Sequence, residues 1–247
     1  MRRAGRAGAA LPACPTGALP AYAHNDYRNA RPLHDALALG FRGAEADLFL
    51  VDGTLRVGHD RREATRGPAF EAAYVAPLAA LVARCGPLVT DGAPFLLAVD
   101  LKRPDAAAFD TLVAVLARHP ALAPRVQVVL VNWFPPPDAW GADARRLLRT
   151  HRRLHHPRDA VAAPDETLAL LSVDYGHTLG RPWTTRARRR AWLAAIADAR
   201  RRAGPGVRLR VHAVPARARL YAELRAAGAD LIGTKSIART ARLLEAR

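Results

Sequence analysis

Two pairs of charged residues, each two positions apart, are the first sign of chemistry in this sequence. Glu45 and Asp47 lie in GAEADLFL, and Asp100 and Lys102 lie in LLAVDLKRP. Residues two apart in a β-strand point to the same face, so each pair would present its side chains together. Two carboxylates on one face of an apolar strand repel each other and lose hydration. One divalent cation offsets both costs, and oxygen-only ligands favour Mg²⁺ or Ca²⁺ over zinc.

The second pair extends this site. Asp100 can supply a third carboxylate to the same cation. Lys102 is one of only two lysines in a chain that otherwise uses arginine, and a compact ammonium suits a phosphate oxygen. Two plainer interpretations stay open: Glu45 and Asp47 as ordinary acids on an exposed strand face, and Asp100 with Lys102 as a structural ion pair.

Two histidines lie near these pairs in the sequence. His24 follows a short apolar run in AYAHNDY, and His59 lies in LRVGHD, just after a hairpin predicted from VDGTLRV. Imidazole has an ordinary pKa of about 6.5, so it exchanges protons near neutrality. We expect His24 and His59 to flank one substrate as general base and general acid. We assign no role to His34, His119, His151, His155 and His156.

Short apolar runs alternate with helix-like stretches along the chain, which is typical of parallel βα units. We expect strands at 21–23, 43–50, 95–101, 125–132, 168–174, 207–214 and 230–233. We expect helices at 32–39, 76–83, 106–117, 143–151, 185–203 and 217–227. The 247 residues suit a single (β/α)₈ barrel, whose functional residues lie at the carboxyl ends of the strands. The predicted organisation is a disordered lead-in over residues 1–18 and one barrel domain over 19–247.

The order of these motifs resembles a known superfamily. AHNDY, RPLHDALALGFRGAEADLFLVDGTLRVGHD and LLAVDLK together resemble the phospholipase-C-like phosphodiesterases, a superfamily of TIM barrels. It includes glycerophosphodiester phosphodiesterases and sphingomyelinase D enzymes, and the sequence is most similar to its altered-inheritance-of-mitochondria branch. The resemblance implies that His24 and His59 are the acid–base pair. It also implies that Glu45, Asp47 and Asp100 bind one divalent cation, with Lys102 on the phosphate.

The later motifs LLSVDYGHTLGRPW, VRLRVHAVPA and GADLIGTKSI are similar to late strands of that branch. This chain departs from relatives at His212, where they tend to have an aromatic residue, and at Lys235 in the last strand's motif. These departures affect the substrate more than the reaction. We expect five further residues to lie in or behind the substrate site: Asn25, Asp26, Asn132, Asp174 and His212.

The composition is strongly basic, with a net charge of +16 and a pI near 11.3. Arginine is spread through the expected helices without interleaved aromatic residues, which favours solvated helix faces over a nucleic-acid surface. Attraction to an anionic membrane surface is compatible with an enzyme acting on lipid head groups. No apolar run is long enough for a membrane span.

Two cysteines, Cys14 and Cys85, make neither a disulfide framework nor a metal cluster. Cys14 lies in LPAC after Arg2, Arg3 and Arg6, but the apolar segment before it is too short for an export signal. The compartment therefore stays open between cytoplasmic and exported.

The sequence predicts a metal-dependent phosphodiester hydrolase acting on a glycerophosphodiester or a phospholipid. One alternative is a catalytically silent barrel that binds a phosphorylated ligand. Another is a basic protein that binds anionic surfaces or nucleic acid. A metal-dependent amidohydrolase is a weaker alternative, because the His-x-His pair of its first strand is absent.

Overall fold

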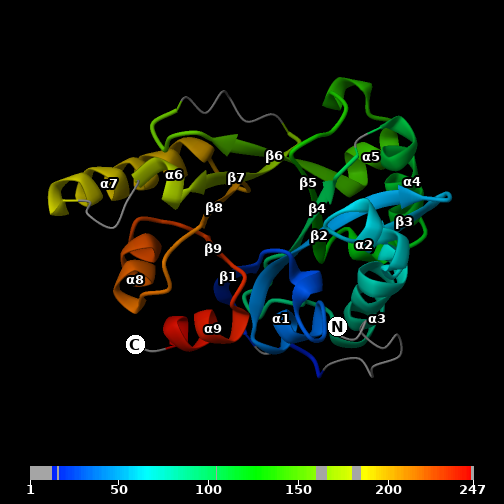
Figure 1. The fold of residues 1–247 in the computed structure, drawn as a ribbon, viewed down its shortest axis with the longest axis horizontal. Coiled ribbons are helices and arrows are strands. Elements are labelled where there is room, and N and C mark those ends of the chain that lie inside the picture. The colour runs from blue at the N-terminus through cyan, green and yellow to red at the C-terminus, as the bar shows by residue number, and fades with distance from the viewer. Residues whose placement is uncertain (1–12, 16, 104, 160–165, 180–184, 246–247) are drawn as a thin grey trace.

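A closed ring of parallel strands forms the centre of the molecule (Figure 1). The computed structural model describes residues 13–15, 17–103, 105–159, 166–179 and 185–245. In these residues eight parallel strands form the ring: β1 (Leu19–Ala23), β2 (Phe41–Val51), β4 (Phe95–Leu101), β5 (Val126–Val131), β6 (Leu148–Leu154), β7 (Leu168–Asp174), β8 (Arg208–His212) and β9 (Leu231–Thr234). The ring is closed because β1 pairs with both β2 and β9. This architecture confirms the predicted (β/α)₈ barrel.

One short strand lies outside the ring. β3 (Thr54–Val57) pairs antiparallel with β2 and turns back through Asp52 and Gly53, which have φ angles of 48° and 72°. Positive φ at both central residues is the signature of a tight hairpin turn. The predicted hairpin is confirmed, and it returns the chain to the carboxyl end of β2.

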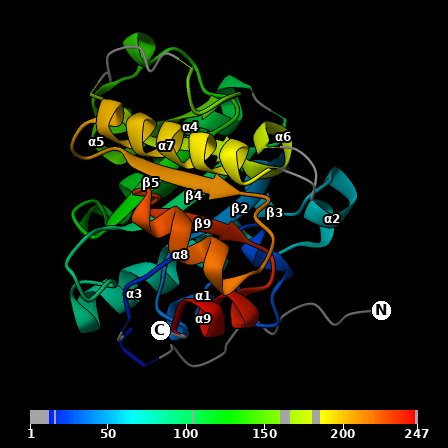
Figure 2. The same ribbon diagram turned by 90° about the vertical axis from the view of Figure 1, so that its left-hand side faces the viewer.

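Helices connect the strands and cover the outside of the ring (Figure 2). The α-helices are α1 (His34–Ala38), α2 (Arg61–Arg66), α3 (Ala76–Cys85), α4 (Ala106–Ala117), α5 (Ala142–Leu147), α6 (Tyr175–Leu179), α7 (Arg186–Ala203), α8 (Ala218–Ala226) and α9 (Ile237–Glu245). Shorter helical turns are η1 (Asp26–Arg28), η2 (Glu71–Val75), η3 (Pro120–Leu122) and η4 (Pro137–Ala139). Of the helices described, none combines the length and the apolar character that crossing a membrane requires.

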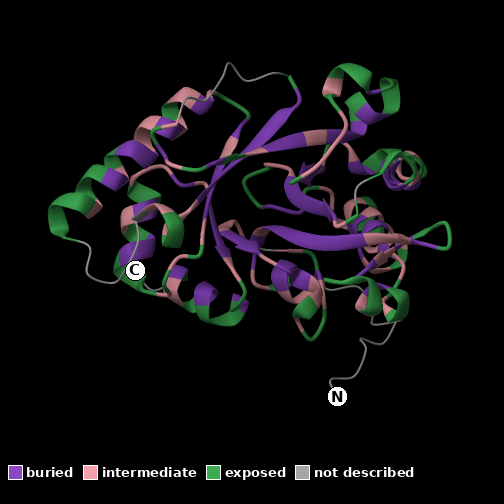
Figure 3. Ribbon diagram, turned by 45° about the horizontal axis from the view of Figure 1, so that its top comes forward, coloured by how far each residue is buried: buried purple, intermediate pink, exposed green. Residues whose placement is uncertain are grey.

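The strands are buried while the helices keep exposed outer faces (Figure 3). All seven residues of β4 are buried, which explains its uninterrupted apolar run. The larger apolar cluster packs helices against strands and includes Ala21 and Ala23 of β1. A smaller cluster, with Tyr22 of β1, Ala98 of β4 and Val129 of β5, occupies the opposite faces of the strands. Residues that alternate with the helix-facing set therefore fill the barrel interior.

Every predicted strand is recovered, but β6, α2, α6 and α9 were not predicted, and one predicted helix is wrong at its end. The helix expected at 143–151 ends at Leu147, and the chain continues directly as β6. The apolar positions Leu148 and Leu154 of β6 are separated by arginines and a histidine, so the usual apolar run of a barrel strand is missing. The sequence of residues 148–151 therefore wrongly predicts a helix.

The lead-in also needs correction. Cys14 forms a disulfide with Cys85 at the end of α3, a pairing that the sequence did not predict. Gly17 packs closely on Gly40, since a Cβ at Gly17 would lie 2.6 Å from the Gly40 Cα. The prediction of disorder is therefore wrong from Cys14 to residue 18 within the described residues, while residues 1–12 lie outside them.

The disulfide joins residues 71 positions apart, and the loop that it closes contains β1 and β2. In the chain-entropy model such a loop stabilises the folded state by about 4 kcal/mol, because the reduced unfolded chain is freer. We expect the double variant C14S/C85S to lower the free energy of urea unfolding by 2–4 kcal/mol, to order of magnitude. The wild type in reducing agent should show the same loss, and equal stability of oxidised protein and double variant would contradict this role.

Candidate active site

Three carboxylates meet inside the barrel at the carboxyl ends of β2 and β4. Glu45 and Asp47 share one face of β2, and the strand register places Asp100 of β4 beside Asp47. All three side chains are buried, and their carboxylate oxygens lie within 4.8 Å of one another. The structure thus brings together the three residues predicted to bind a cation.

Two cations partly balance this negative charge. The Lys102 Nζ lies 2.6 Å from Asp100 Oδ2 and 3.2 Å from Asp47 Oδ2. Burial would lower the pKa of Lys102, but these carboxylates raise it overall, so the ammonium stays charged. The plainer interpretation of Asp100 and Lys102 as an ion pair describes the contacts seen. A role of Lys102 on phosphate stays a prediction.

The second cation comes from the opposite side of the barrel. Arg210 on β8 is almost completely buried, lies with its Cζ 4.7 Å from the centre of the Tyr22 ring, and has its Nη1 4.0 Å from Glu45 Oε2. Burial opposes ionisation of Glu45, but His24, Arg210 and Lys102 outweigh it and lower the pKa of Glu45 to about 2. Sequence analysis missed Arg210, although its place in RLRVH, two residues before His212, puts both on one strand face.

Both predicted histidines are held by these carboxylates. His24 Nδ1 lies 2.7 Å from Glu45 Oε2, and His59 Nδ1 lies 2.7 Å from Asp47 Oδ2. The His59 contact with Asp47 has hydrogen-bond geometry, and the His24 contact with Glu45 is within ion-pair distance. Each Nε2 is then left for other partners, and both side chains are partly exposed. The structure therefore places two oriented imidazoles beside the three acids.

Tyr27 completes the contacts of Asp47 and was not predicted from the sequence. Its hydroxyl donates to Asp47 Oδ2 at 2.6 Å and lies 3.2 Å from His59 Nδ1. Burial raises the pKa of Tyr27, and the hydrogen bond to Asp47 raises it further, so the phenol stays protonated. Tyr27 is the last residue of the AYAHNDY motif, where a phenol could have been noticed as a donor for the acids. It fixes both Asp47 and the ring of His59.

Asn25, Asp26 and Asn132 occupy different positions around this site. Asn132 donates to Asp100 Oδ2 at 2.7 Å, so it supports one of the three acids directly. Asn25 is buried in a left-handed conformation directly after His24. Asp26 is fully buried and bonds to the backbone N of Leu33, to Asn29 and to Tyr74. Asp26 therefore anchors the loop after β1, and its contacts are not with the three acids.

Asp174 and His212 end β7 and β8 and pair with each other. His212 Nδ1 lies 3.6 Å from Asp174 Oδ2. Gly233 packs against His212, and its lack of a side chain leaves space for the imidazole, because a Cβ at Gly233 would lie 3.0 Å from His212 Cβ. Burial and then Arg210 lower the pKa of His212 to about 4, although Asp174 acts in the opposite direction. His212 is therefore neutral at pH 7. Its buried Nε2 has no hydrogen-bond partner among the described residues.

Comparisons with known proteins find similarity over the first half of the chain. Residues 16–119 match a family model described as the AIM6-like phosphodiesterase domain. The chain is 32% identical over 75 residues to the altered inheritance of mitochondria protein 6 homolog of Arthroderma benhamiae, and the match covers 28% of this chain and 24% of that relative. The chain thus spans about a quarter of the length of the curated relative it matches.

A solved structure extends the comparison to almost the whole chain. The glycerophosphodiester phosphodiesterase from Agrobacterium tumefaciens str. C58 superimposes with a TM-score of 0.50 at 15% identity. The superposition covers 90% of this chain and 97% of that one. At this identity the likeness shows a shared fold.

Asp26 gives the fold a pH dependence that can be measured. Burial raises its pKa to about 6, although bonds from Leu33, Tyr74 and Asn29 lower it. A raised carboxyl pKa means that the folded state holds the proton more tightly, so stability falls as pH rises from about 4 to 6. We expect the difference in unfolding free energy between wild type and D26N to change by about 3 kcal/mol between pH 4 and pH 7.

The measurement is urea unfolding of both proteins at several pH values, which cancels the groups that the two proteins share. D35N is a matched control, since Asp35 is a partly exposed acid on the neighbouring helix α1. A wild-type-to-D26N difference that stays constant between pH 4 and pH 7 would contradict the assignment.

Proposed function

We propose that this chain is a phosphodiesterase of the PLC-like TIM-barrel type and hydrolyses phosphodiesters with the help of one divalent cation. The family-model match over residues 16–119 and the shared barrel fold support this proposal. The observation that carries the proposal is the joint placement of three buried carboxylates and two oriented histidines. Acids alone would suit a cation-binding protein. The added pair of imidazoles supports acid–base chemistry.

The three acids fit a hard divalent cation. Their donor set is oxygen only, and the buried Oδ1 of Asp47 accepts no hydrogen bond within the described structure. Glu45, Asp47 and Asp100 would hold the ion, which we propose to be Mg²⁺ or Ca²⁺. When bound, such an ion supplies positive charge that stabilises the phosphoryl oxygens as the reaction develops.

The histidines would move the protons. The nucleophile, either water or a hydroxyl of the substrate itself, attacks phosphorus as the bond to the leaving oxygen breaks. One Nε2, of His24 or His59, takes the proton of the nucleophile, and the other gives a proton to the leaving oxygen. Glu45 and Asp47 hold the two rings through Nδ1 and stabilise each imidazolium that forms.

The substrate class proposed is a glycerophosphodiester or the head group of a phospholipid. The support is the barrel shared with a glycerophosphodiester phosphodiesterase, together with a basic chain that attracts anionic substrates. Asp174 and His212 lie at the carboxyl ends of β7 and β8, where a barrel presents substrate-facing residues. They are our candidates for contacts to the alcohol groups of the phosphodiester.

Removing either proton carrier should stop turnover without unfolding the protein. We expect H24A and H59A each to lower kcat by roughly 10²–10⁴-fold on glycerophosphodiesters, since general acid–base catalysis contributes that much. H119Q is the matched control, because His119 bonds to Glu71 away from the three acids. Wild-type activity in H24A would contradict the assignment, and phosphate-ester binding without any turnover would favour a silent barrel.

Cation binding can be tested without activity. We expect Mg²⁺ or Ca²⁺ to raise the melting temperature of the wild type, because the ion binds the folded state and relieves repulsion among the acids. D100N should lose most of this shift, whereas D143N, a change at an exposed acid, should keep it. Isothermal titration with each ion gives the affinity directly, and equal binding by wild type and D100N would contradict the site.

A further inference from the structure

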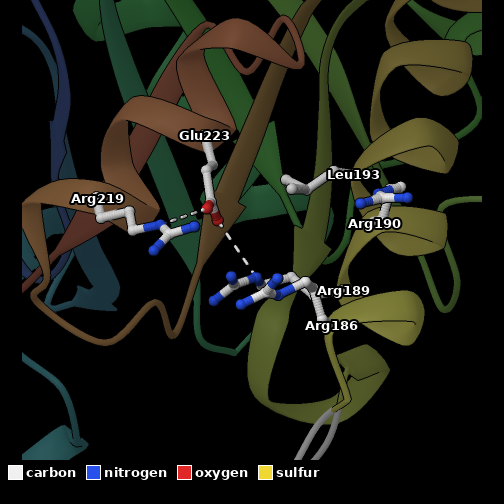
Figure 4. Close-up of a pocket in the computed structure, with 6 residues that line it drawn as sticks. All are labelled: Arg186, Arg189, Arg190, Leu193, Arg219 and Glu223. Carbon is white, nitrogen blue, oxygen red and sulfur yellow. Dashed lines mark hydrogen bonds and ion pairs between the residues drawn. The ribbon is translucent and has the colours of Figure 1, made fainter.

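A cleft lined by arginines lies outside the barrel, between α7 and α8. A cleft of about 340 Å³ is lined by Arg186, Arg189, Arg190 and Leu193 of α7 and by Arg219 and Glu223 of α8. Figure 4 shows Glu223 between the arginines, with its interactions to Arg189 and Arg219 marked. We refer to these six residues as the arginine cleft.

The arginine cleft has an excess of positive charge. Its one carboxylate, Glu223, contacts Arg219 Nε at 3.1 Å and Arg189 Nε at 3.4 Å. Four arginines therefore line the cleft with one acid, which contacts two of them. Elsewhere some arginines have an acid beside them, as in the pairs Arg118–Glu71 and Arg42–Asp91. In the arginine cleft, Arg186 and Arg190 face no such acid among its lining residues.

The arginines of the cleft lie where positive charge destabilises helix α7. Thr185 caps α7, and four of the first five helical residues are arginines. The N-terminal end of a helix carries partial positive charge, so cations there are unfavourable, and neighbouring cations also repel one another. An anion bound in the arginine cleft would offset both effects.

The cleft lies at the rim of the barrel face formed by the carboxyl ends of the strands, where the three acids lie. α7 and α8 follow β7 and β8, so their N-terminal halves lie at the carboxyl ends of those strands, on one side of the barrel (Figure 2). Tyr175 follows the last residue of β7 directly, and its ring contacts Trp192 of α7 edge-on at 5.3 Å. Arg189 lies about one helical turn before Trp192 on α7, so the cleft begins near this aromatic contact.

We propose that the arginine cleft docks the protein on an anionic membrane by binding the phosphate of a lipid head group. Exposed arginines at the rim match the charge of such a surface, and the catalytic face would then be turned toward it. Among the described residues the lining has one apolar side chain, Leu193, and no aromatic ring on which a base could stack, which favours a lipid surface over a nucleic acid. The proposal does not require the barrel to be an active enzyme.

Vesicle binding tests the proposal directly. The full chain is sedimented with vesicles of phosphatidylcholine alone and with vesicles containing about one third phosphatidylserine. We expect binding only to the anionic vesicles and a loss of binding as salt rises. The triple variant R186Q/R190Q/R219Q should bind them on the order of 100-fold more weakly, since each surface cation contributes to attraction.

The control variant removes the same charge elsewhere. R201Q/R225Q/R242Q neutralises three arginines in the last turns of α7, α8 and α9, at the other end of these helices. It should bind within about threefold of wild type, because only the charge near the surface contributes strongly. Circular dichroism and melting temperature confirm that both variants fold.

Three results would overturn the proposal. They are no binding of wild type to anionic vesicles at low salt, equal losses in the two triple variants, and tighter binding to duplex DNA that the cleft variant alone loses. The second result would mean that net charge is responsible. Loss of vesicle binding with unchanged hydrolysis of a soluble phosphodiester separates this proposal from the proposed catalysis.

Discussion

The repulsion among Glu45, Asp47 and Asp100 is the constraint around which the barrel interior is built. Three carboxylates within 4.8 Å, all buried, are unfavourable unless positive charge is brought to them. The fold supplies Lys102 from the end of β4 and Arg210 from β8, on the other side of the ring. Two fixed cations against three acids leave one negative charge in excess, so the site still favours a further cation. Tyr27 and Asn132 add neutral donors to Asp47 and Asp100.

The rest of the interior avoids adding charge to this arrangement. His151 and His212, on β6 and β8, are both kept neutral, because burial and then Arg210 lower their pKa values. His151 instead contacts Ser172 through Nε2 at 2.5 Å. The three acids lie on β2 and β4, and Arg210 lies among neutral imidazoles on the facing side, where Asp174 at the end of β7 is a further acid. This asymmetry leaves His24 and His59, the two partly exposed imidazoles, as the groups at the acids that are able to exchange protons with a substrate.

The acids and their histidines could be predicted from sequence because each depends on local spacing. Period-two pairs at the ends of apolar strands place Glu45 with Asp47, and the parallel register then brings Asp100 beside them. Tyr27 and Arg210 have weaker sequence signals, a phenol at the end of AYAHNDY and an arginine two residues before His212, and their contacts join residues 20 and 165 positions apart. β6 was misassigned because the barrel there buries Thr150 and His151 in place of an apolar run. The Cys14–Cys85 disulfide likewise depends on how the chain before β1 packs against α3.

The effect of the basic composition likewise depends on where the arginines lie, and not only on how many there are. A net charge of +16 predicts attraction to anions but does not say where on the molecule it acts. Many arginines are neutralised by an adjacent acid, and such pairs contribute little to long-range attraction. What remains is set by the places where arginines outnumber acids, and the arginine cleft is one such place, at the rim of the face that carries the three acids. A uniform excess of arginine would give the protein no preferred orientation at a charged surface, whereas a local cluster such as this one favours one orientation.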